Sequence, residues 1–186
     1  MPYSKEGKHH PTGSEEKPLV GIIMGSDSDF PVMGETLELL ADFGIPAEIT
    51  VASAHRSPQL VSEYARNARQ RGLKVLIAGA GAAAHLAGVL AAETSLPVIG
   101  VPIASSPLAG WDALLSIVQM PAGVPVATMA VGKAGARNAA VLAAQMLALN
   151  DTDLHERLRC YKEDLAEKVI EKNRRIQQKI PKCIDS

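Results

Sequence analysis

Five short runs rich in β-branched residues recur along the chain, and each is followed by a segment whose apolar residues have helical spacing. Strands that alternate with helices in this way predict a parallel sheet covered by helices on both faces. At 186 residues, the chain is long enough to form this sheet and its helices as one α/β domain. The predicted strands are residues 19–24, 47–52, 74–79, 97–101 and 125–131.

The helical segments between these runs differ in how much polar surface they carry. Gly44 and Gly72 are predicted to end the first two helices. The next three consist mainly of Ala, Leu, Val and Ile, so we expect them to be buried on more than one side, and packing against another subunit is the simplest account. These three helices are predicted at residues 82–94, 109–120 and 135–149.

The composition changes sharply after Asn150, where a charged segment with helical spacing begins. We therefore predict an N-terminal extension over 1–17, a catalytic α/β domain over 18–150 and a helical tail over 151–186 that packs on a neighbouring subunit. The tail has one sparse apolar stripe that could dock on a neighbour. It consists of Leu154, Leu158, Tyr161, Leu165, Val169 and Ile176.

Composition and charge argue against several classes of partner. The formal net charge is -1, so no basic surface for the phosphates of a nucleic acid is predicted. Only six residues are aromatic, so no platform for stacking its bases is predicted either. The two cysteines, Cys160 and Cys183, lack metal-ligand spacing and fit free thiols in a reducing compartment, so no metal site is predicted. The N-terminus has no apolar signal core, and Gly, Pro and His interrupt the uncharged stretches 75–92 and 113–132. We expect a cytoplasmic protein outside the membrane.

Ligands of an open parallel sheet bind beyond the carboxyl ends of its strands, so the loops there are candidate site segments. The first loop, MGSDSDFP at 24–31, combines hydroxyls with a helix start and predicts an anion site, although Ser28 or Asp29 could simply be a helix N-cap. The second, SAHRSP at 53–58, places His55 beside Arg56. Arginine suits a phosphate and histidine suits proton transfer, whereas the alternative is a solvent-exposed loop pair.

The third loop, GAGAAAHL at 79–86, is a small-residue elbow that would let a ligand approach the backbone. We expect His85 within it to be a buried histidine that is hydrogen-bonded to the structure. The loop over 102–110 is predicted to be mobile or to cover a ligand. A phospho-receiver domain is excluded because no acceptor Asp follows the third strand, and an FMN carrier is disfavoured because only Phe30 and Trp111 could flank a flavin.

Taken together and in order, MGSDSD, SAHRSP, GAGAAAHLAG and LLSIVQMPAGVPVATMAVGKAGARNAA resemble the PurE family of de novo purine biosynthesis, over residues 19–158. The resemblance implies a flavodoxin-like three-layer α/β/α fold with strand order 2-1-3-4-5. It also implies a homo-octamer with sites shared between subunits, and neither a metal nor an organic cofactor.

Position by position, the resemblance implies a catalytic proton-transfer role for His55. Residues matched to ribose and phosphate binding are Ser26, Asp29, Ser53 and Arg56, and those matched to the loop beneath the imidazole ring are Gly79, Gly81 and His85. We therefore expect His55, and not His85, to carry the proton. The family pattern of the third loop is usually GAGGAAHLPG, so Ala82 and Ala87 replace a Gly and a Pro here, and the Ala82 methyl could crowd the ring.

The implied activity is an isomerase that moves a carboxylate from N5 to ring C4 of a carboxyaminoimidazole ribonucleotide in IMP biosynthesis. The segment GKAGARNAA at 132–140 resembles the mutase branch of the family. Two alternatives remain at this point: a carboxylase that uses free CO2, and a non-catalytic flavodoxin-like nucleotide-binding module.

Overall fold

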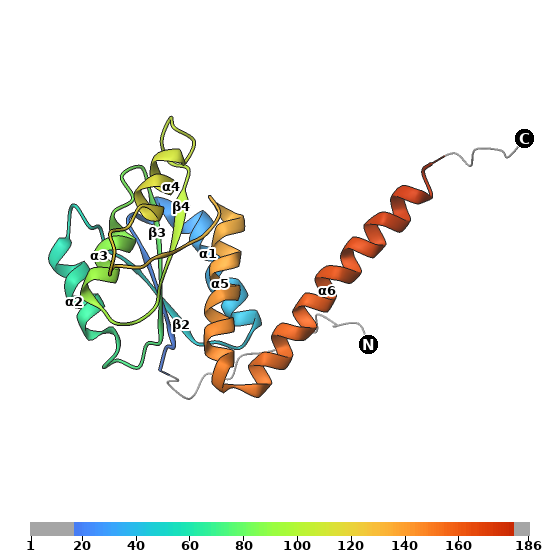
Figure 1. Cartoon of the computed structure of the whole chain (residues 1–186), viewed down its shortest axis with the longest axis horizontal. Coiled ribbons are helices and arrows are strands. Elements are labelled where there is room, and N and C mark those ends of the chain that lie inside the picture. The colour runs from blue at the N-terminus through green and yellow to red at the C-terminus, as the bar shows by residue number, and fades with distance from the viewer. Residues whose placement is uncertain (1–16, 181–186) are drawn as a thin grey trace, which may run out of the picture.

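The computed structural model describes residues 17–180, which form one five-stranded parallel sheet with helices on both faces (Figure 1). The strand order is β2-β1-β3-β4-β5, so the predicted fold and its strand order are confirmed. The strands are β1 Val20–Met24, β2 Ala47–Val51, β3 Val75–Gly81, β4 Val98–Ile103 and β5 Ala127–Thr128.

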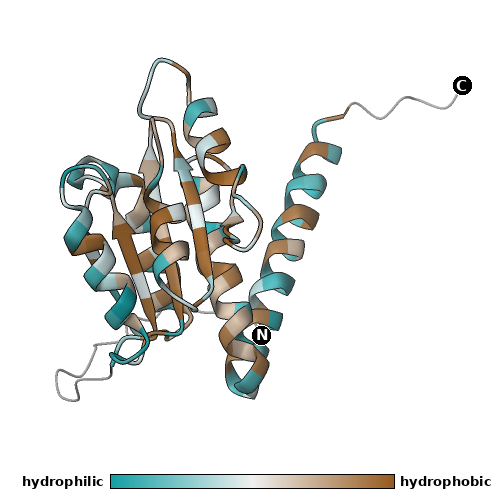
Figure 2. Cartoon of the chain, turned by 60° about the vertical axis from the view of Figure 1, so that its left-hand side comes forward, coloured by the Kyte–Doolittle hydropathy of each residue, from teal (hydrophilic) through white to brown (hydrophobic). Residues whose placement is uncertain are grey.

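The helices form two layers around this sheet, each closing its own apolar core. One face is covered by α1 Phe30–Asp42 and α5 Lys133–Leu147, and the other by α2 Pro58–Ala68, α3 Leu86–Glu93 and α4 Trp111–Val118. Apolar residues are concentrated in the strands and in the helix surfaces that face them (Figure 2). The remaining elements are the short helices η1 Asp27–Asp29 and η2 Ala148–Asn150 and the long helix α6 Thr152–Gln177.

Burial explains why the central strands are almost continuously apolar. Every residue of β1 and β4 is buried, and β3 is buried up to its last residue, because helices cover both faces of a parallel sheet. The edge strand β2 is only half-buried. Gly44 and Gly72 follow α1 and α2 with φ of +69° and +101°, the left-handed conformation that closes a helix C-terminus. Both predicted helix stops are therefore confirmed.

Local backbone constraints explain three of the differences between the predicted and observed element boundaries. The fifth strand covers two residues instead of 125–131, since Pro125 has no N–H to donate and the chain then bonds to β4 only intermittently, through Met129 N–H and Gly132 N–H. Positive φ at Ala82, and at Ala109 with Gly110, delays the starts of α3 and α4 to Leu86 and Trp111. The segments that precede these two helices are therefore turns.

The first turns of α6 pack on the domain, and the rest of the helix projects away from it (Figure 1). Asp151 caps the helix by accepting the Leu154 N–H at 2.9 Å. Leu154 and Leu158 are buried in the core beside α5, and the Tyr161 ring meets the Phe43 ring edge-on with centroids 5.2 Å apart. Only the first half of the predicted apolar stripe is therefore covered by its own chain.

Some predictions fall on residues outside the described part of the chain. These are the N-terminal extension, except for Lys17, and the Cys183 thiol together with the end of the tail at 181–186. Within residues 17–180, no helix combines the length and the apolar character that a membrane crossing requires. The stretches 75–92 and 113–132 instead supply β3 with most of α3, and most of α4 with β5.

Candidate functional site

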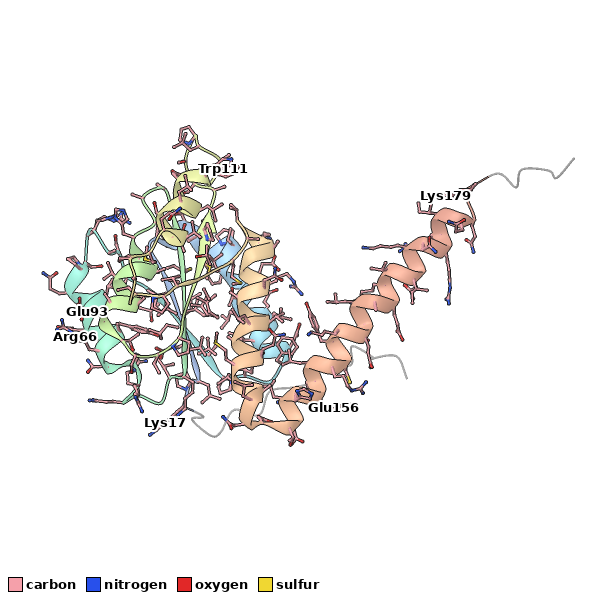
Figure 3. All side chains as sticks on the ribbon, viewed as in Figure 1. Lys17, Arg66, Glu93, Trp111, Glu156 and Lys179 are labelled. Atoms are coloured by element: carbon pink, nitrogen blue, oxygen red, sulfur yellow. The ribbon has the colours of Figure 1, made fainter. Side chains whose placement is uncertain are left out.

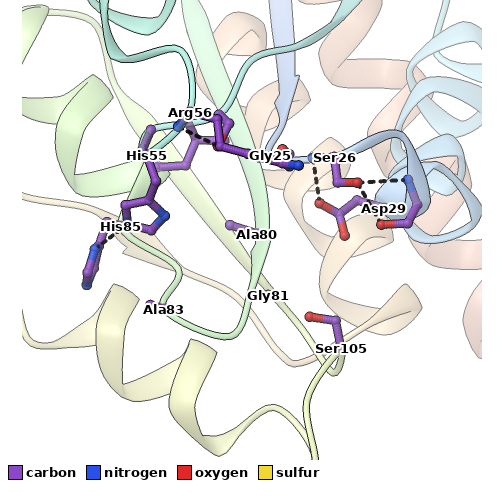
Figure 4. A pocket seen from close by; sticks show the side chains of 14 residues that line it. Gly25, Ser26, Asp29, His55, Arg56, Ala80, Gly81, Ala83, His85 and Ser105 are labelled. Atoms are coloured by element: carbon purple, nitrogen blue, oxygen red, sulfur yellow. Dashed lines mark hydrogen bonds between the residues drawn. The ribbon is translucent and has the colours of Figure 1, made fainter.

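A cavity of about 290 Å³ lies where β1, β2 and β3 end, at the carboxyl edge of the sheet (Figure 4). It gathers seven of the eight predicted site residues, and Gly79 is the exception. Its lining consists of Gly25, Ser26, Ser28, Asp29, Ser53, Ala54, His55, Arg56, Ala80, Gly81, Ala83, His85, Leu86 and Ser105.

The loop after β1 is held by a capping box that leaves a carboxylate at the cavity. Ser26 caps η1 by accepting the Ser28 N–H, and Asp29 accepts the Ser26 N–H at 3.2 Å. Asp29 also occupies the N-cap position of α1, as the sequence allowed, but its side chain forms no cap hydrogen bond to that helix. Asp29 is only 5% exposed, and its burial raises the pKa of its carboxyl, assisted by the nearby Asp27 charge and opposed by the Ser26 hydrogen bond.

Arg56 joins the first loop to the second. Its guanidinium donates to the Gly25 carbonyl at 3.2 Å, and its backbone N–H donates to the Ser53 hydroxyl at 3.2 Å. No carboxylate within residues 17–180 forms a salt bridge with it, so most of its donors remain available for an anion. Ser57 and Pro58 occupy the N-cap and first helical positions of α2, but the Ser57 hydroxyl bonds to the Ser53 backbone instead of capping the helix.

The two histidines of the cavity are hydrogen-bonded to each other. His55 Nε2 lies 2.8 Å from His85 Nδ1, and the rings meet at 81°. One nitrogen must donate and the other accept, so each ring fixes the tautomer of the other. The expectation of a buried His85 was wrong: this side chain is exposed, because the turn before α3 places it at the helix start and over the cavity.

Two glycines of the β3 loop have different surroundings. A side chain at Gly81 would overlap the Ser105 hydroxyl, so the glycine lets the β4 loop close one side of the cavity. Gly79 is buried away from the cavity, where a side chain would overlap Met33 of α1. Its carbonyl accepts the Gly25 N–H at 3.2 Å, so the structure gives Gly79 a position that supports the first loop from behind.

Comparison with known proteins identifies the family. A family model described as AIR carboxylase matches residues 19–168. The chain belongs to the AIR carboxylase family. An N5-carboxyaminoimidazole ribonucleotide mutase of Pyrococcus horikoshii is 56% identical over 163 residues, which cover 88% of this chain and 91% of that protein. The Bacillus subtilis protein of the same name is 56% identical over 155 residues, which cover 83% of this chain and 96% of its own.

The fold agrees with a solved relative. A crystal structure of Treponema denticola PurE superposes with a TM-score of 0.76 at 31% identity and covers 85% of this chain and 98% of that one. The predicted resemblance to the PurE family is thus confirmed. Within residues 17–180, no group of three or more His, Cys, Asp or Glu side chains is arranged to hold a metal ion.

This member of the AIR carboxylase family departs from the usual loop pattern at Ala82 and Ala87. Ala82 adopts a φ of +51°, a conformation that glycine tolerates and alanine disfavours, but it does not line the cavity. Its methyl therefore affects the backbone more directly than the ligand space. Ala87 is fully buried in the first turn of α3, where the backbone N–H has no intrahelical acceptor, so a proline there would cost no helical hydrogen bond.

Sequence reasoning missed several lining residues, of which Ser105 offers the most chemistry. Its hydroxyl reaches the cavity from the β4 loop, opposite the histidines (Figure 4). The signal was available, because β4 neighbours β3 and its loop opens at the same sheet edge. Ala54 and Leu86 lie within the predicted loops 53–58 and 79–86, but tertiary packing decides which side chains of those loops reach the wall.

Proposed function

We propose that this cavity catalyses the N5-carboxyaminoimidazole ribonucleotide mutase reaction of purine biosynthesis, in which a carboxylate moves from N5 to ring C4. The observation that carries the proposal is the His55–His85 pair, which lies in the same cavity as several hydroxyls and Arg56, an arginine that no described carboxylate pairs with. An acid–base group beside an anion site is what a phosphorylated substrate with a mobile proton requires. The mutase names of the close relatives support the same reaction.

The polar groups divide the cavity into two ends. Arg56 offers a fixed guanidinium to the substrate phosphate, and the hydroxyls of Ser53 and Ser28 add donors around it. Asp29 and Ser26 lie beside this end and suit the ribose hydroxyls, with the carboxylate accepting and the serine donating. A ribonucleotide anchored there directs its imidazole ring toward the histidines.

The proton balance of the reaction requires one acid–base group. Cleavage of the N5–carboxylate bond releases CO2, and N5 takes up a proton. Ring C4 then attacks CO2 to form the new carbon–carbon bond, and the C4 proton leaves. His55 gives the first proton and receives the second, so it returns to its starting state without a cofactor. His85 acts as a positioning residue that fixes the orientation and tautomer of the His55 ring.

The wall beside the histidines suits transient CO2. Ala80, Ala83 and Leu86 present small or apolar surfaces, and none of the residues that line the cavity is a lysine. A lysine amine would trap CO2 as a carbamate, whereas apolar walls bind it weakly and keep it close to C4. Confinement and proton transfer together therefore account for the chemistry.

We also propose that the protein is a cytoplasmic homo-octamer with sites shared between subunits. The support is an apolar surface on and before α4, where Leu108, Trp111 and Leu115 are 61%, 67% and 52% exposed. Trp111 points outward at the tip of the domain (Figure 3). Contiguous apolar surface of this kind is typical of a subunit interface.

The direct test incubates the purified full chain with N5-carboxyaminoimidazole ribonucleotide, without ATP or added bicarbonate. We expect the C4 carboxylate to form with wild type and with His155→Asn, a control at an exposed histidine of α6 outside the cavity. His55→Asn should lose the activity. Turnover of only aminoimidazole ribonucleotide with CO2 would instead assign the carboxylase reaction, and ribonucleotide binding without either reaction would leave a binding module.

A further inference from the structure

The outer half of α6 carries apolar side chains that no described residue covers. Beyond Tyr161 the helix leaves the domain, and Lys179 near its end lies far from the rest of the molecule (Figure 3). An apolar stripe of this length on a free helix favours association. Its exposed members are Leu165 at 45%, Val169 at 63% and Ile176 at 55%, and Ile180, at 54%, follows just beyond the end of the helix.

Charge is divided along this helix. Residues 151–167 contain six acidic and three basic side chains, whereas residues 168–180 contain one acidic and five basic side chains. Acidic residues near a helix N-terminus and basic ones near its C-terminus also suit the helix dipole, but that effect is confined to the first and last turns. A division that runs through the whole helix therefore indicates charge complementarity toward a partner.

We propose that the partner is α6 of a second copy of this chain, packed antiparallel with Leu165 at the twofold axis. In this register, Val169 of one helix comes level with Tyr161 of the other, and the basic outer half of each helix lies beside the acidic inner half of its mate. Asp151 comes level with Lys179, for example. A parallel pair would instead place the basic halves together.

The same register gives the end of the stripe a place to dock. Ile180 comes level with Asn150, beside a groove of about 340 Å³ between α5 and α6 that includes Ala148 and Leu158 in its lining. The groove also includes Leu149, whose apolar side chain is 82% exposed to solvent. The antiparallel pair thus covers two apolar surfaces that the single chain leaves in water. The family match ends at residue 168, so most of the outer half of α6 lies beyond it.

Cysteine crosslinking of the full chain tests the proposal. In a background with Cys160→Ser and Cys183→Ser, Leu165→Cys should form a disulfide-linked dimer under mild oxidation on the order of a hundredfold faster than Glu167→Cys. Glu167 is the matched control because two residues along a helix turn the side chain to the opposite side. Equal rates for the two variants would overturn the proposal, including the case in which an unrelated protein covers the stripe.

Two further measurements test whether the two helices are antiparallel and whether the apolar stripe causes their pairing. A mixture of Val169→Cys and Tyr161→Cys chains should crosslink faster than Val169→Cys alone. Faster crosslinking of Val169→Cys alone would show a parallel pair and contradict the proposal. Adding Val169→Glu and Ile176→Glu to the Leu165→Cys chain should reduce its crosslinking to the Glu167→Cys rate, with circular dichroism showing that the helix is retained. Unchanged crosslinking would also contradict the proposal.

Discussion

The two ends of the sheet each carry a cluster of polar side chains, and the clusters differ in how much hydrogen-bonding capacity they leave unused. At the amino end, Tyr64 donates to Glu48 at 2.6 Å, and Arg71 pairs with Glu48 while lying 5.1 Å from the Tyr64 ring centroid. Burial and Glu48 hold the pKa of the Tyr64 hydroxyl well above its usual range. Each group there has its partner within the chain.

At the carboxyl end, hydrogen bonds hold the polar groups in place but leave part of their hydrogen-bonding capacity free. Among residues 17–180, Arg56 has only the Gly25 carbonyl and the Ser53 hydroxyl as acceptors, and Asp29 accepts one backbone N–H. His55 and His85 bond to each other and remain exposed. A closed cluster stabilises the fold, whereas an open one retains capacity for a ligand, so substitutions at the two ends should affect different properties.

The largest expected effect is the loss of turnover in His55→Asn. This substitution keeps a polar group of similar size but removes the titrating nitrogen, so we expect kcat to fall at least about a hundredfold while the fold and ribonucleotide binding persist. His85→Asn should lower kcat less, because it loosens the His55 ring without removing the acid–base group. Steady-state kinetics measures both, and near-normal kcat in His55→Asn would contradict its assignment.

At the amino end, Glu48→Ala should destabilise the fold and leave kcat unchanged. It leaves the buried Tyr64 hydroxyl without its acceptor, which costs about 1–3 kcal/mol in the free energy of unfolding. Adding Tyr64→Phe should recover part of that loss, because the orphaned hydroxyl is then absent. Urea denaturation gives both values, and a fall in kcat at full stability would break the distinction between the two ends.

Arg56→Lys should weaken substrate binding while preserving stability. Lysine keeps the charge but loses the planar fork, so we expect binding weaker by about 1–3 kcal/mol. Arg69→Lys, at an exposed arginine beyond the end of α2, is the matched control and should bind normally. Titration calorimetry at fixed ionic strength compares the two, and equal affinities would argue against a phosphate contact at Arg56.

Ala82→Gly should stabilise the protein slightly. The left-handed backbone at residue 82 costs alanine about 1–2 kcal/mol, and the greater freedom of glycine in the unfolded chain takes back about 0.4–1 kcal/mol. The difference between these two ranges is a net gain of about 0–1.6 kcal/mol, with a middle value of about 0.8 kcal/mol. Ala83→Gly, at a residue without positive φ, should instead lose stability. Denaturant midpoints distinguish the two, and a loss in both would show that residue 82 is not strained.

The smallest effect concerns the pH dependence of stability at Asp29. Burial raises the pKa of this carboxyl in the folded state, so its favourable contribution is present below the ordinary value of 3.8 and is lost as the pH rises through the raised value. Asp29→Asn should therefore raise Tm slightly near neutral pH and leave it unchanged at about pH 3. It should also weaken ribonucleotide binding. A lower Tm at neutral pH would show that the carboxylate stabilises the fold.

The regular parts of the molecule were predictable from sequence because periodicity reports burial directly. Alternating runs predicted the parallel sheet, and the resemblance supplied its strand order. His85 was misjudged because a single alanine in a left-handed conformation, Ala82, moves the start of α3 by a turn. Ser105 lies in the loop 102–110 that was predicted to be mobile or to cover a ligand, but its individual place in the cavity depends on close packing against Gly81, which no local pattern encodes.

The retention of carboxylate label during the reaction tests the central claim most directly. The substrate is N5-carboxyaminoimidazole ribonucleotide with carbon-13 in its carboxylate, and the purified protein converts it in the presence of unlabelled bicarbonate. If the cavity holds CO2 between the two steps, the C4 carboxylate of the product keeps the label. A product whose label is diluted to the level of the bicarbonate pool would mean that CO2 leaves the cavity, and it would contradict carboxylate transfer within one site.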